Sequence, residues 1–310
     1  GVAGVGQGGF MVVEADESDG TLALYRPDIA VVTNIEFDHM EHFASVSAFE
    51  NCFRTFIGNA RRKVVYCSED PRAAALCRGN PKAVSYGFCP GAAVRGAGLK
   101  LTDSSLSFIL HARGRRQGVI ELPAPGRHNA LNALAAAAVG LELGLSFGEI
   151  RRALKKVSLP RRRFEKVVEK GGVLVMSDYA HHPSEIKALV RTASKLKHRR
   201  LLAVYQPHRY TRTLALGPDF PPAFEGIDEL VLCPVYAASE RPLRGGSIWD
   251  LYGHFRVHGS RFTVQGSAAF AELTAAKEGR GPSVAVARTL EQAWEYFRHK
   301  LTRGDVFLVV

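Results

Sequence analysis

Short apolar runs alternate with amphipathic segments over the second half of the chain. The runs have the length and residue types of buried strands and lie at 173–176, 201–205, 229–233, 283–287 and 305–310. Segments with helical periodicity fall between them, near 184–198, 247–256, 267–278 and 289–302. This alternation predicts a mostly parallel sheet with right-handed crossovers.

The first half of the chain has a less regular pattern. Apolar runs predict strands at 10–13, 29–33 and 63–66, and helical patterns occur at 48–60 and 71–78. Residues 81–122 read as β-strands separated by turns, and helices are expected at 129–143 and 146–157. The fold class is therefore α/β, with a partial, mixed sheet first and a mostly parallel sheet after a boundary near residue 158.

One segment of the second half, VLVMSDYAHHPSEIKA (173–188), carries the strongest candidate site. Its strand ends in Asp178, Tyr179 and His181, and a helix is expected from Ser184, the predicted N-cap, with Glu185 in the first turn. Ligands of open α/β sheets bind where such strands end. The set can shape a pocket, hold a metal or move protons. A helix cap with surface histidines is an equal alternative for the motif alone.

The next two strand ends are also polar or aromatic. QPHRYTRT (206–213) is expected to place Arg209 and Arg212 on one loop, where their planar guanidinium groups would suit phosphate or carboxylate oxygens. A solvated basic turn is the alternative. CPVYAASERPLRGG follows the third strand. Three consecutive strand ends of this kind favour a ligand site at that edge of the sheet.

The first half offers further candidates. A predicted strand delivers Glu14 into the acidic run EADESD, and hard oxygen ligands of this kind suit Mg²⁺, although an ordinary acidic loop is commoner. Asn34 and His39 follow the next strand, where His39 is a metal ligand or a solvated loop histidine. His128, Asn129 and Asn132 lie at the start of a helix, where Asn129 is either the N-cap or, with Asn132, one of two amides of which one reads a base edge.

Composition narrows the class of protein. The 310 residues carry a net charge of +11, which suits nucleic acid or phosphorylated small molecules as partners. The basic residues are dispersed and no RNA-binding or zinc-finger motif occurs, so nucleic acid is not expected. No apolar run reaches the roughly 20 residues of a membrane span. The five cysteines form no CxxC pair, which is typical of reduced thiols in a cytoplasmic protein.

Seven motifs occur together and in one order. They are EADESD, TNIEFDHM, RHNALNA, RRRFE, DYAHHPSE, QPHRYTRT and PVYAASE. As a set they strongly resemble the Mur ligase family of peptidoglycan synthesis, over nearly the whole chain. The resemblance implies an ATPase-type central domain at 1–158 and a Rossmann-like domain for the amino acid at 159–310. The family's amino-terminal UDP-sugar domain and its phosphate-binding loop are not found, so we expect an incomplete chain.

The resemblance implies ATP-dependent formation of an amide bond through an acyl phosphate. ATP and Mg²⁺ would be the cofactors, with Glu14 and His39 as the metal ligands. Contacts to ATP would be made by His128, Asn129, Arg163, Asp178 and Tyr179. Asn34 would lie at the acyl phosphate, and Arg163 matches the family's hinge arginine.

The implied substrates are UDP-N-acetylmuramate and L-alanine. Asn34, His39, Arg163 and His181 would be catalytic, and His181, Arg209 and Arg212 would bind substrate. QPHRYTRT and PVYAASE favour L-alanine over the tripeptide that a recycling branch of the family attaches to the same UDP-sugar. Two alternatives stay open, namely that tripeptide ligase and a non-catalytic remnant that only binds nucleotide.

Overall fold

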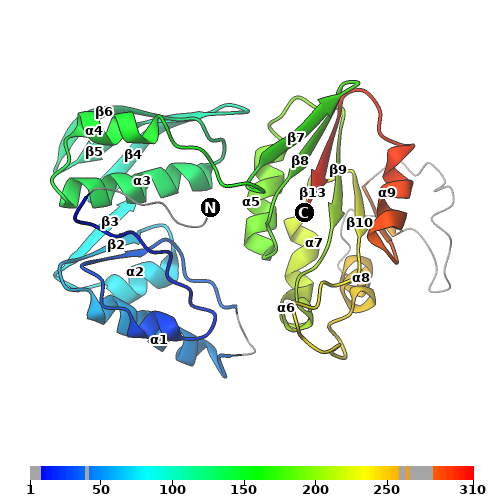
Figure 1. The fold of residues 1–310 in the computed structure, drawn as a ribbon, viewed down its shortest axis with the longest axis horizontal. Coiled ribbons are helices and arrows are strands. Elements are labelled where there is room, and N and C mark those ends of the chain that lie inside the picture. Colours follow the sequence, from blue (N-terminus) through cyan, green and yellow to red (C-terminus); the bar gives the residue numbers. More distant parts are fainter. Residues whose placement is uncertain (1–7, 39–41, 258–262, 265–281) are drawn as a thin grey trace. The chain divides into compact units, whose positions relative to one another are not determined.

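The computed structural model describes residues 8–38, 42–257, 263–264 and 282–310. The chain forms two compact units, Gly1–Val84 and Ser85–Val310, and Figure 1 labels their elements. Hydrogen bonding orders the first sheet β1-β2-β3-β4-β5-β6 and the second β11-β12-β10-β9-β13-β8-β7. No helix of the described residues is long and apolar enough to span a bilayer.

The first unit is built on two parallel strands and the helices that follow them. Its elements are η1 (Thr21–Leu24), β1 (Ile29–Val32), α1 (Val46–Asn59), β2 (Lys63–Cys67) and α2 (Pro71–Cys77). Ser45 is the N-cap of α1, and its hydroxyl oxygen accepts a hydrogen bond from the Ala48 N–H at 3.1 Å. The helix buries Phe49, Phe53 and Phe56 at helical spacing, which confirms the predicted amphipathic helix.

The strand predicted at 10–13 is wrong. The structure gives this segment no regular element, and Phe10, Met11, Val12 and Val13 are exposed, Val12 by 97%. An apolar run forms a buried strand only when a neighbouring strand and a core cover it. Among the described residues nothing covers this run, so the sequence pattern alone misleads.

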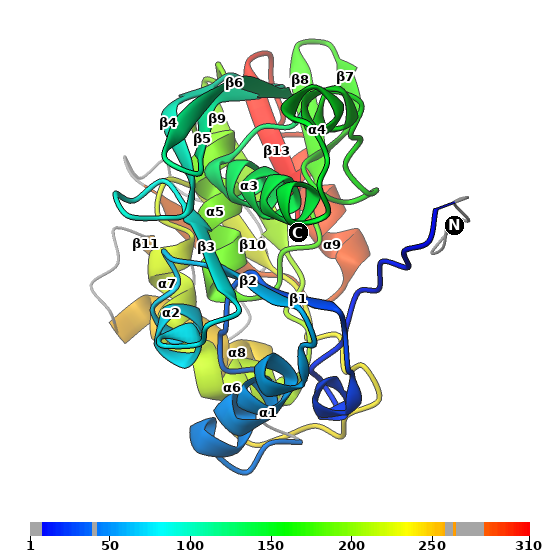
Figure 2. The same ribbon diagram turned by 90° about the vertical axis from the view of Figure 1, so that its left-hand side faces the viewer.

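The second unit begins with a mixed layer. Its strands are β3 (Ala83–Gly87), which starts in the first unit, β4 (Val94–Leu101), β5 (Leu106–Ala112) and β6 (Arg115–Leu122). In this layer β3 pairs parallel with β4, while β4, β5 and β6 pair antiparallel. The helices α3 (Arg127–Glu142) and α4 (Phe147–Leu154) pack on β4, β5 and β6 (Figure 2). Ser146 and Glu149 form a capping box at α4, as predicted for Ser146.

Asn129 does not cap α3. The N-cap residue is Gly126, with a φ of 94° and no side-chain cap bond. Asn129 lies within the first turn and its Nδ2 donates to the Pro125 carbonyl oxygen at 2.6 Å. A Cβ on Gly126 would come 2.6 Å from His128 Cε1, so only glycine fits this entry to the helix.

A seven-stranded sheet forms the rest of the second unit. All its neighbouring strands are parallel except β7, which pairs antiparallel with β8. The strands are β7 (Glu165–Lys170), β8 (Val173–Ser177), β9 (Arg200–Tyr205), β10 (Glu229–Leu232), β11 (Thr263–Val264), β12 (Ser283–Val286) and β13 (Asp305–Val309). The predicted mostly parallel sheet is confirmed, whereas β7 lies in the stretch that the sequence assigned to a boundary.

Helices cover both faces of this sheet. They are α5 (Pro183–Ala193), α6 (Tyr210–Leu216), η2 (Gly217–Asp219), α7 (Phe220–Ala223), α8 (Ile248–Val257) and α9 (Leu290–Arg298). Leu201, Ala203 and Tyr205 point toward one core with side chains of α5, α7 and α8, while Leu202 joins another core with α9. This alternation is the period of two expected of strands. The helix predicted at 267–278 lies outside the described residues.

Candidate active site at the carboxyl edge of the seven-stranded sheet

The first loop of the site follows β8 and holds Asp178, Tyr179 and His181. One Asp178 oxygen accepts the Phe164 N–H at 2.6 Å, and the other accepts the Ala180 N–H at 2.8 Å. Burial raises the pKa of Asp178, although these two N–H groups oppose the shift. A carboxylate fixed from two sides by backbone keeps the loop in one shape.

The same loop begins helix α5, but not at the predicted residue. His182 is the N-cap in place of Ser184, because Pro183 occupies the first helical turn and its fixed φ suits that position. Glu185 reaches back, as in a capping box, and its Oε2 accepts the N–H groups of His181 at 3.0 Å and His182 at 3.3 Å. Its Oε1 lies 3.4 Å from Arg163 Nη1.

Tyr179 is the exposed member of the loop, at 42% of its surface. The guanidinium carbon of Arg162 lies 4.9 Å from the centre of its ring, and the Tyr179 N–H donates to the Arg162 carbonyl oxygen at 2.7 Å. The basic stretch 161–163 is therefore fastened to the strand end.

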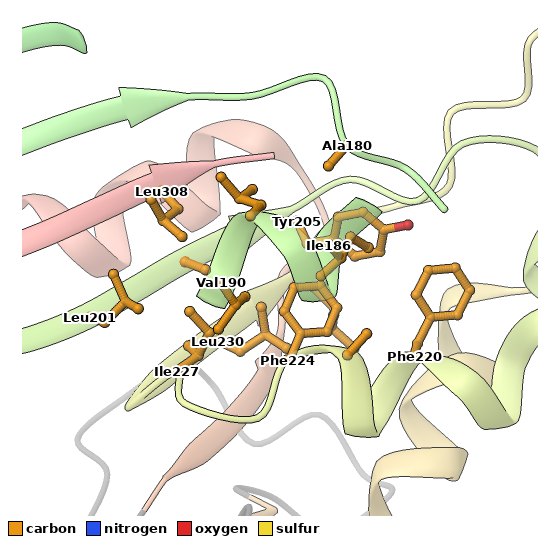
Figure 3. Packing of buried hydrophobic residues seen from close by; sticks show 14 of the residues in the cluster. Ala180, Ile186, Val190, Leu201, Tyr205, Phe220, Phe224, Ile227, Leu230 and Leu308 are labelled. Atoms are coloured by element: carbon orange, nitrogen blue, oxygen red, sulfur yellow. The ribbon is translucent and has the colours of Figure 1, made fainter. Parts of the chain in front are cut away.

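The hydrophobic core contacts the loop after β8 through Tyr205, the last residue of β9. Figure 3 shows Tyr205 packed near Ile186 and Phe224. Its hydroxyl donates to the His181 carbonyl oxygen at 3.3 Å. Burial raises the pKa of Tyr205, so the hydroxyl keeps the proton that it donates.

The second loop follows β9, and the prediction that Arg209 and Arg212 share one loop is wrong. Arg209 is the N-cap residue of α6, and Arg212 lies inside that helix with 3% of its surface exposed. The guanidinium of Arg212 donates from Nη1 to the His208 carbonyl oxygen at 3.1 Å and lies 3.3 Å from His208 Nδ1. Arg212 thus holds His208, which the sequence reading did not select.

A third loop, after β10, fastens the second. The Arg209 N–H donates to the Tyr236 carbonyl oxygen at 2.8 Å. Glu240 accepts the Thr211 hydroxyl at 2.6 Å and the Thr211 N–H at 3.1 Å, and its Oε1 lies 3.8 Å from Arg209 Nη1. The backbone of Arg209 has a φ of 72° and a ψ of 136°, a strained conformation for a residue with a Cβ.

Four rings join the three loops. The centroid distances are 5.2 Å from Tyr179 to His181, 5.8 Å from His181 to His208, and 5.3 Å from His208 to Tyr236. Burial, then the charges of Arg212, His181 and Arg209, lower the pKa of His208. The row of rings therefore contains His208, whose imidazole stays neutral, next to His181, whose imidazole lies beside the Glu185 carboxylate.

The structure thus gathers six of the predicted site residues at one sheet edge. They are Arg163, Asp178, Tyr179, His181, Arg209 and Arg212. His128 and Asn129 lie at the start of α3. Burial lowers the pKa of His128, and the charges of Asp178, Arg163 and Glu185 also act on it. Glu14 and Asn34 belong to the first unit and are exposed, and His39 lies outside the described residues.

The sequence analysis named Glu185 only as an acid in the first helical turn, and it did not select His208 or Glu240 as parts of this edge. For Glu185 a signal exists, because it stands four residues after His181 and three after His182 at a helix start. For Glu240 none exists, since its partner Thr211 is 29 residues away in the chain. Its place depends on how two strand ends meet.

The predicted metal ligands, Glu14 and His39, do not form a metal site among the residues that the structure describes. Within those residues no group of three or more His, Cys, Asp or Glu side chains is placed to hold a metal ion. Asp16 accepts the Ser18 N–H, and Asp19 accepts the N–H and hydroxyl of Thr21. These carboxylates are engaged in local turns, so the described acidic run does not by itself fit a metal.

Comparison with known proteins assigns both halves of the chain to domains of one family. A family model described as the Mur ligase middle domain matches residues 6–140, and one described as the Mur ligase glutamate ligase domain matches residues 162–310. The curated UDP-N-acetylmuramate–L-alanine ligase of Solidesulfovibrio magneticus is 40% identical over 288 residues, and that of Desulfosudis oleivorans is 36% identical over 310. The alignments cover 91% and 99% of this chain.

The chain spans about three-fifths of the length of these relatives, 61% and 63% respectively. Among solved structures, the UDP-N-acetylmuramate-alanine ligase MurC from Thermotoga maritima superimposes with a TM-score of 0.70 at 23% identity. That alignment covers 96% of this chain and 59% of the other. It shows that the two chains share a fold.

Proposed function

Because the chain belongs to the Mur ligase family, we propose that it takes part in the ATP-dependent joining of L-alanine to UDP-N-acetylmuramate in peptidoglycan precursor synthesis. One observation carries the proposal, namely the convergence of three loops at the carboxyl edge of the seven-stranded sheet. They present a fixed carboxylate, two imidazoles and Arg209 next to one another. The names of the curated relatives support the choice of substrates.

The residues divide the work by their chemistry. ATP would supply the phosphoryl group that converts the muramoyl carboxylate into an acyl phosphate. Asp178, Tyr179 and Arg163, with His128 and Asn129 at the start of α3, would contact the nucleotide. Tyr179 suits this role because its ring is exposed while its backbone is fastened to Arg162.

The amino acid would be held by the loops after β8 and β9. Arg209 offers a guanidinium at the edge, only 3.8 Å from the Glu240 carboxylate, and a ligand carboxylate would compete for it. His181 would place the amine of L-alanine, and Asn34 would act at the acyl phosphate. Arg212 remains a predicted anion contact, although in the structure its guanidinium binds His208.

Mg²⁺ is part of the proposal on the basis of family resemblance, with Glu14 and His39 as its ligands. When bound, such an ion would neutralise charge on the phosphoryl oxygens. The described residues of the acidic run form no group of three or more ligands placed to hold the ion.

We further propose that residues 1–158 form a central domain that binds ATP and Mg²⁺, and that residues 159–310 form a domain that binds the amino acid and adds contacts to ATP. We propose that the protein is cytoplasmic. The family matches end at residue 140 and resume at 162, on either side of that boundary, which supports the division. The substrates are a nucleotide sugar, a free amino acid and ATP, all of which occur in the cytoplasm.

The test is turnover by the natural protein that carries this sequence. Release of inorganic phosphate from ATP should require both UDP-N-acetylmuramate and L-alanine, and mass spectrometry should find the new amide. Arg209→Ala should raise the KM for L-alanine by about tenfold or more, since a charge-assisted contact contributes about 1.5–3 kcal/mol. Arg298→Ala, which removes an exposed guanidinium on α9, is the matched control and should leave turnover unchanged.

The alternatives give different results in the same assay. Phosphate release that requires a tripeptide in place of L-alanine would identify the recycling reaction. Nucleotide binding without phosphate release under any acceptor would identify a non-catalytic module. Either result would reject the proposed reaction.

A further inference from the structure

His181 has the tautomer that a proton acceptor needs. Its Nδ1 lies 2.9 Å from the Tyr179 carbonyl oxygen. A carbonyl oxygen can only accept a hydrogen bond, so Nδ1 carries the hydrogen and a neutral ring holds its lone pair on Nε2. The side chain is 26% exposed, so the ring is accessible to a ligand.

Glu185 places a negative charge beside this ring. Its Oε2 lies 3.7 Å from His181 Nδ1, and two backbone N–H groups hold that oxygen in place. Burial works to raise the pKa of Glu185, but His181, these N–H groups and Arg163 together lower it. The carboxylate is therefore ionised at neutral pH.

The positively charged groups near His181 and the second imidazole oppose its protonation. His208 faces it from the loop after β9, with Arg209 and Arg212 behind, and Arg163 approaches from the basic stretch. Tyr179 and Asp178 lie on its own loop, Glu240 lies beyond Arg209, and the neutral hydroxyl of Tyr205 binds its carbonyl. Glu185 is the carboxylate held against the ring.

We propose that His181 and Glu185 form a proton-accepting pair, in which Nε2 of His181 takes a proton from the ammonium group of the incoming amino acid and the Glu185 carboxylate stabilises the resulting imidazolium. His181 would be the catalytic base and Glu185 a positioning residue. The assignment rests on the proposed ligase function, and it deepens the role of His181 from placing the amine to activating it.

The step balances as follows. The ammonium nitrogen gives one proton to Nε2, and its freed electron pair forms the C–N bond with the carbonyl carbon of the acyl phosphate. The C–O bond to the phosphate breaks and its electron pair leaves with the phosphate, which takes the second proton from the amide nitrogen. The products are the amide, hydrogen phosphate and an imidazolium that later releases its proton to water.

The neighbouring imidazole explains why His181 is the residue that accepts the proton. Arg212 donates toward Nδ1 of His208, and three positive or titrating neighbours disfavour a charge on that ring. His208 stays neutral while His181, with Glu185 at its side, can become charged. The two rings are 5.8 Å apart, so one proton on His181 further disfavours a second on His208.

The test is a titration of the histidine rings by nitrogen-15 NMR on the chain itself, which needs no turnover. In the native chain, neutral His181 should show the chemical shifts of the Nδ1–H tautomer. Glu185→Gln keeps the size of the side chain and an accepting oxygen but removes the charge. It should lower the pKa of His181 by about one unit, which is a tenfold smaller imidazolium-to-imidazole ratio at a given pH near that pKa.

Glu149→Gln is the matched control. Glu149 forms the same capping box at α4, where its Oε2 accepts the Ser146 N–H at 2.8 Å. Removing its charge should cost a similar amount of helix-start stability and leave the titration of His181 unchanged. If Glu185 only caps α5, both variants will leave the pKa of His181 where it was, and the pair is rejected. A native His181 that is Nε2–H when neutral also rejects it.

The outcome separates this proposal from the proposed function. A missing pKa shift with L-alanine-dependent phosphate release intact removes the pair and leaves the ligase. A pKa shift of the expected size without turnover keeps the pair as a physical property of the loop and removes the ligase reaction.

Discussion

The two edges of the seven-stranded sheet are both rich in charge, but they use it differently. At the amino edge, Arg200 begins β9 and Asp305 begins β13, and their side chains pair at 2.6 Å. Glu229 begins β10, accepts from Tyr296 and lies 2.7 Å from Lys300. Each of these carboxylates has a positive side chain as its partner, from β9 for Asp305 and from the segment after α9 for Glu229.

At the carboxyl edge the carboxylates are held mainly by backbone N–H groups. Asp178, Glu185 and Glu240 each accept such bonds, and the arginines near them lie at the longer distances of 3.4–3.8 Å. The backbone is strained here, with positive φ at Arg162 and Arg209. The charges at the amino edge therefore stabilise the fold by pairing with one another, whereas the side chains at the carboxyl edge are positioned for a ligand.

The largest expected effect is at the amino edge. Asp305 is 1% exposed and accepts from Arg200 and Thr302, so Asp305→Asn should lower the free energy of unfolding by about 3 kcal/mol. Urea unfolding followed by tryptophan fluorescence measures it, because both tryptophans, Trp249 and Trp294, belong to helices α8 and α9 beside this sheet.

The control for this variant is Glu169→Gln, which breaks an exposed pair with Lys166 on β7. It should cost about 0.5 kcal/mol or less. The titration of His181 should be the same in both variants as in the native chain. Equal losses from the two variants, or a shifted His181, would contradict the division of labour between the edges.

The Asp305 carboxylate also predicts that the free energy of unfolding depends on pH in acid. Burial works to raise the pKa of Asp305, but the bonds from Arg200 and Thr302 lower it overall. A lowered folded pKa contributes stability above the unfolded value of about 3.9, and this stability is lost as the pH falls toward the folded pKa. The difference between the native chain and Asp305→Asn should therefore be constant near neutral pH and shrink below about pH 4. A difference that grows on acidification would reverse the sign.

Arg209 gives a smaller effect at the carboxyl edge. Its φ of 72° with a ψ of 136° suits glycine, so Arg209→Gly should be more stable than Arg209→Ala by about 1–2 kcal/mol. Both variants remove the guanidinium, so the difference reports the strained backbone alone. Thermal unfolding of the two variants measures it, and equal stability would mean that the loop stores no strain there.

The sequence predicted the second sheet well because its strands are nearly continuous apolar runs. Residues such as Leu201, Leu202 and Ala203 are buried on both faces, so their pattern does not depend on what lies beside the chain. The run at 10–13 has the same appearance but lacks cover among the described residues, and there the pattern failed. Whether an apolar run becomes a strand depends on its neighbours in space.

The site was predictable in part for a similar reason. Asp178, Tyr179 and His181 follow a predicted strand directly, so the chain itself places them at the edge. His208 and Glu240 depend on contacts between loops, and Arg212 was misplaced because the helix α6 within QPHRYTRT is short and has no side-chain cap. Local signals find residues near strand ends but not the partners that orient them.

The smallest effect tests whether the core below the carboxyl edge holds its loop. Tyr205→Phe removes only the hydroxyl that donates to the His181 carbonyl oxygen at 3.3 Å, and it should lower the free energy of unfolding by about 1 kcal/mol or less. The ring of residue 205 is fully buried against Phe224 and should keep this packing in the variant. The loss of stability should therefore appear in the loop that holds His181. The amide hydrogens of His181 and His182 should then exchange several-fold faster, while those at the amino end of β13, next to Asp305, keep their rates. Equal acceleration at both places would show that the hydroxyl supports the whole sheet, and that the loop is not a separately held part of it.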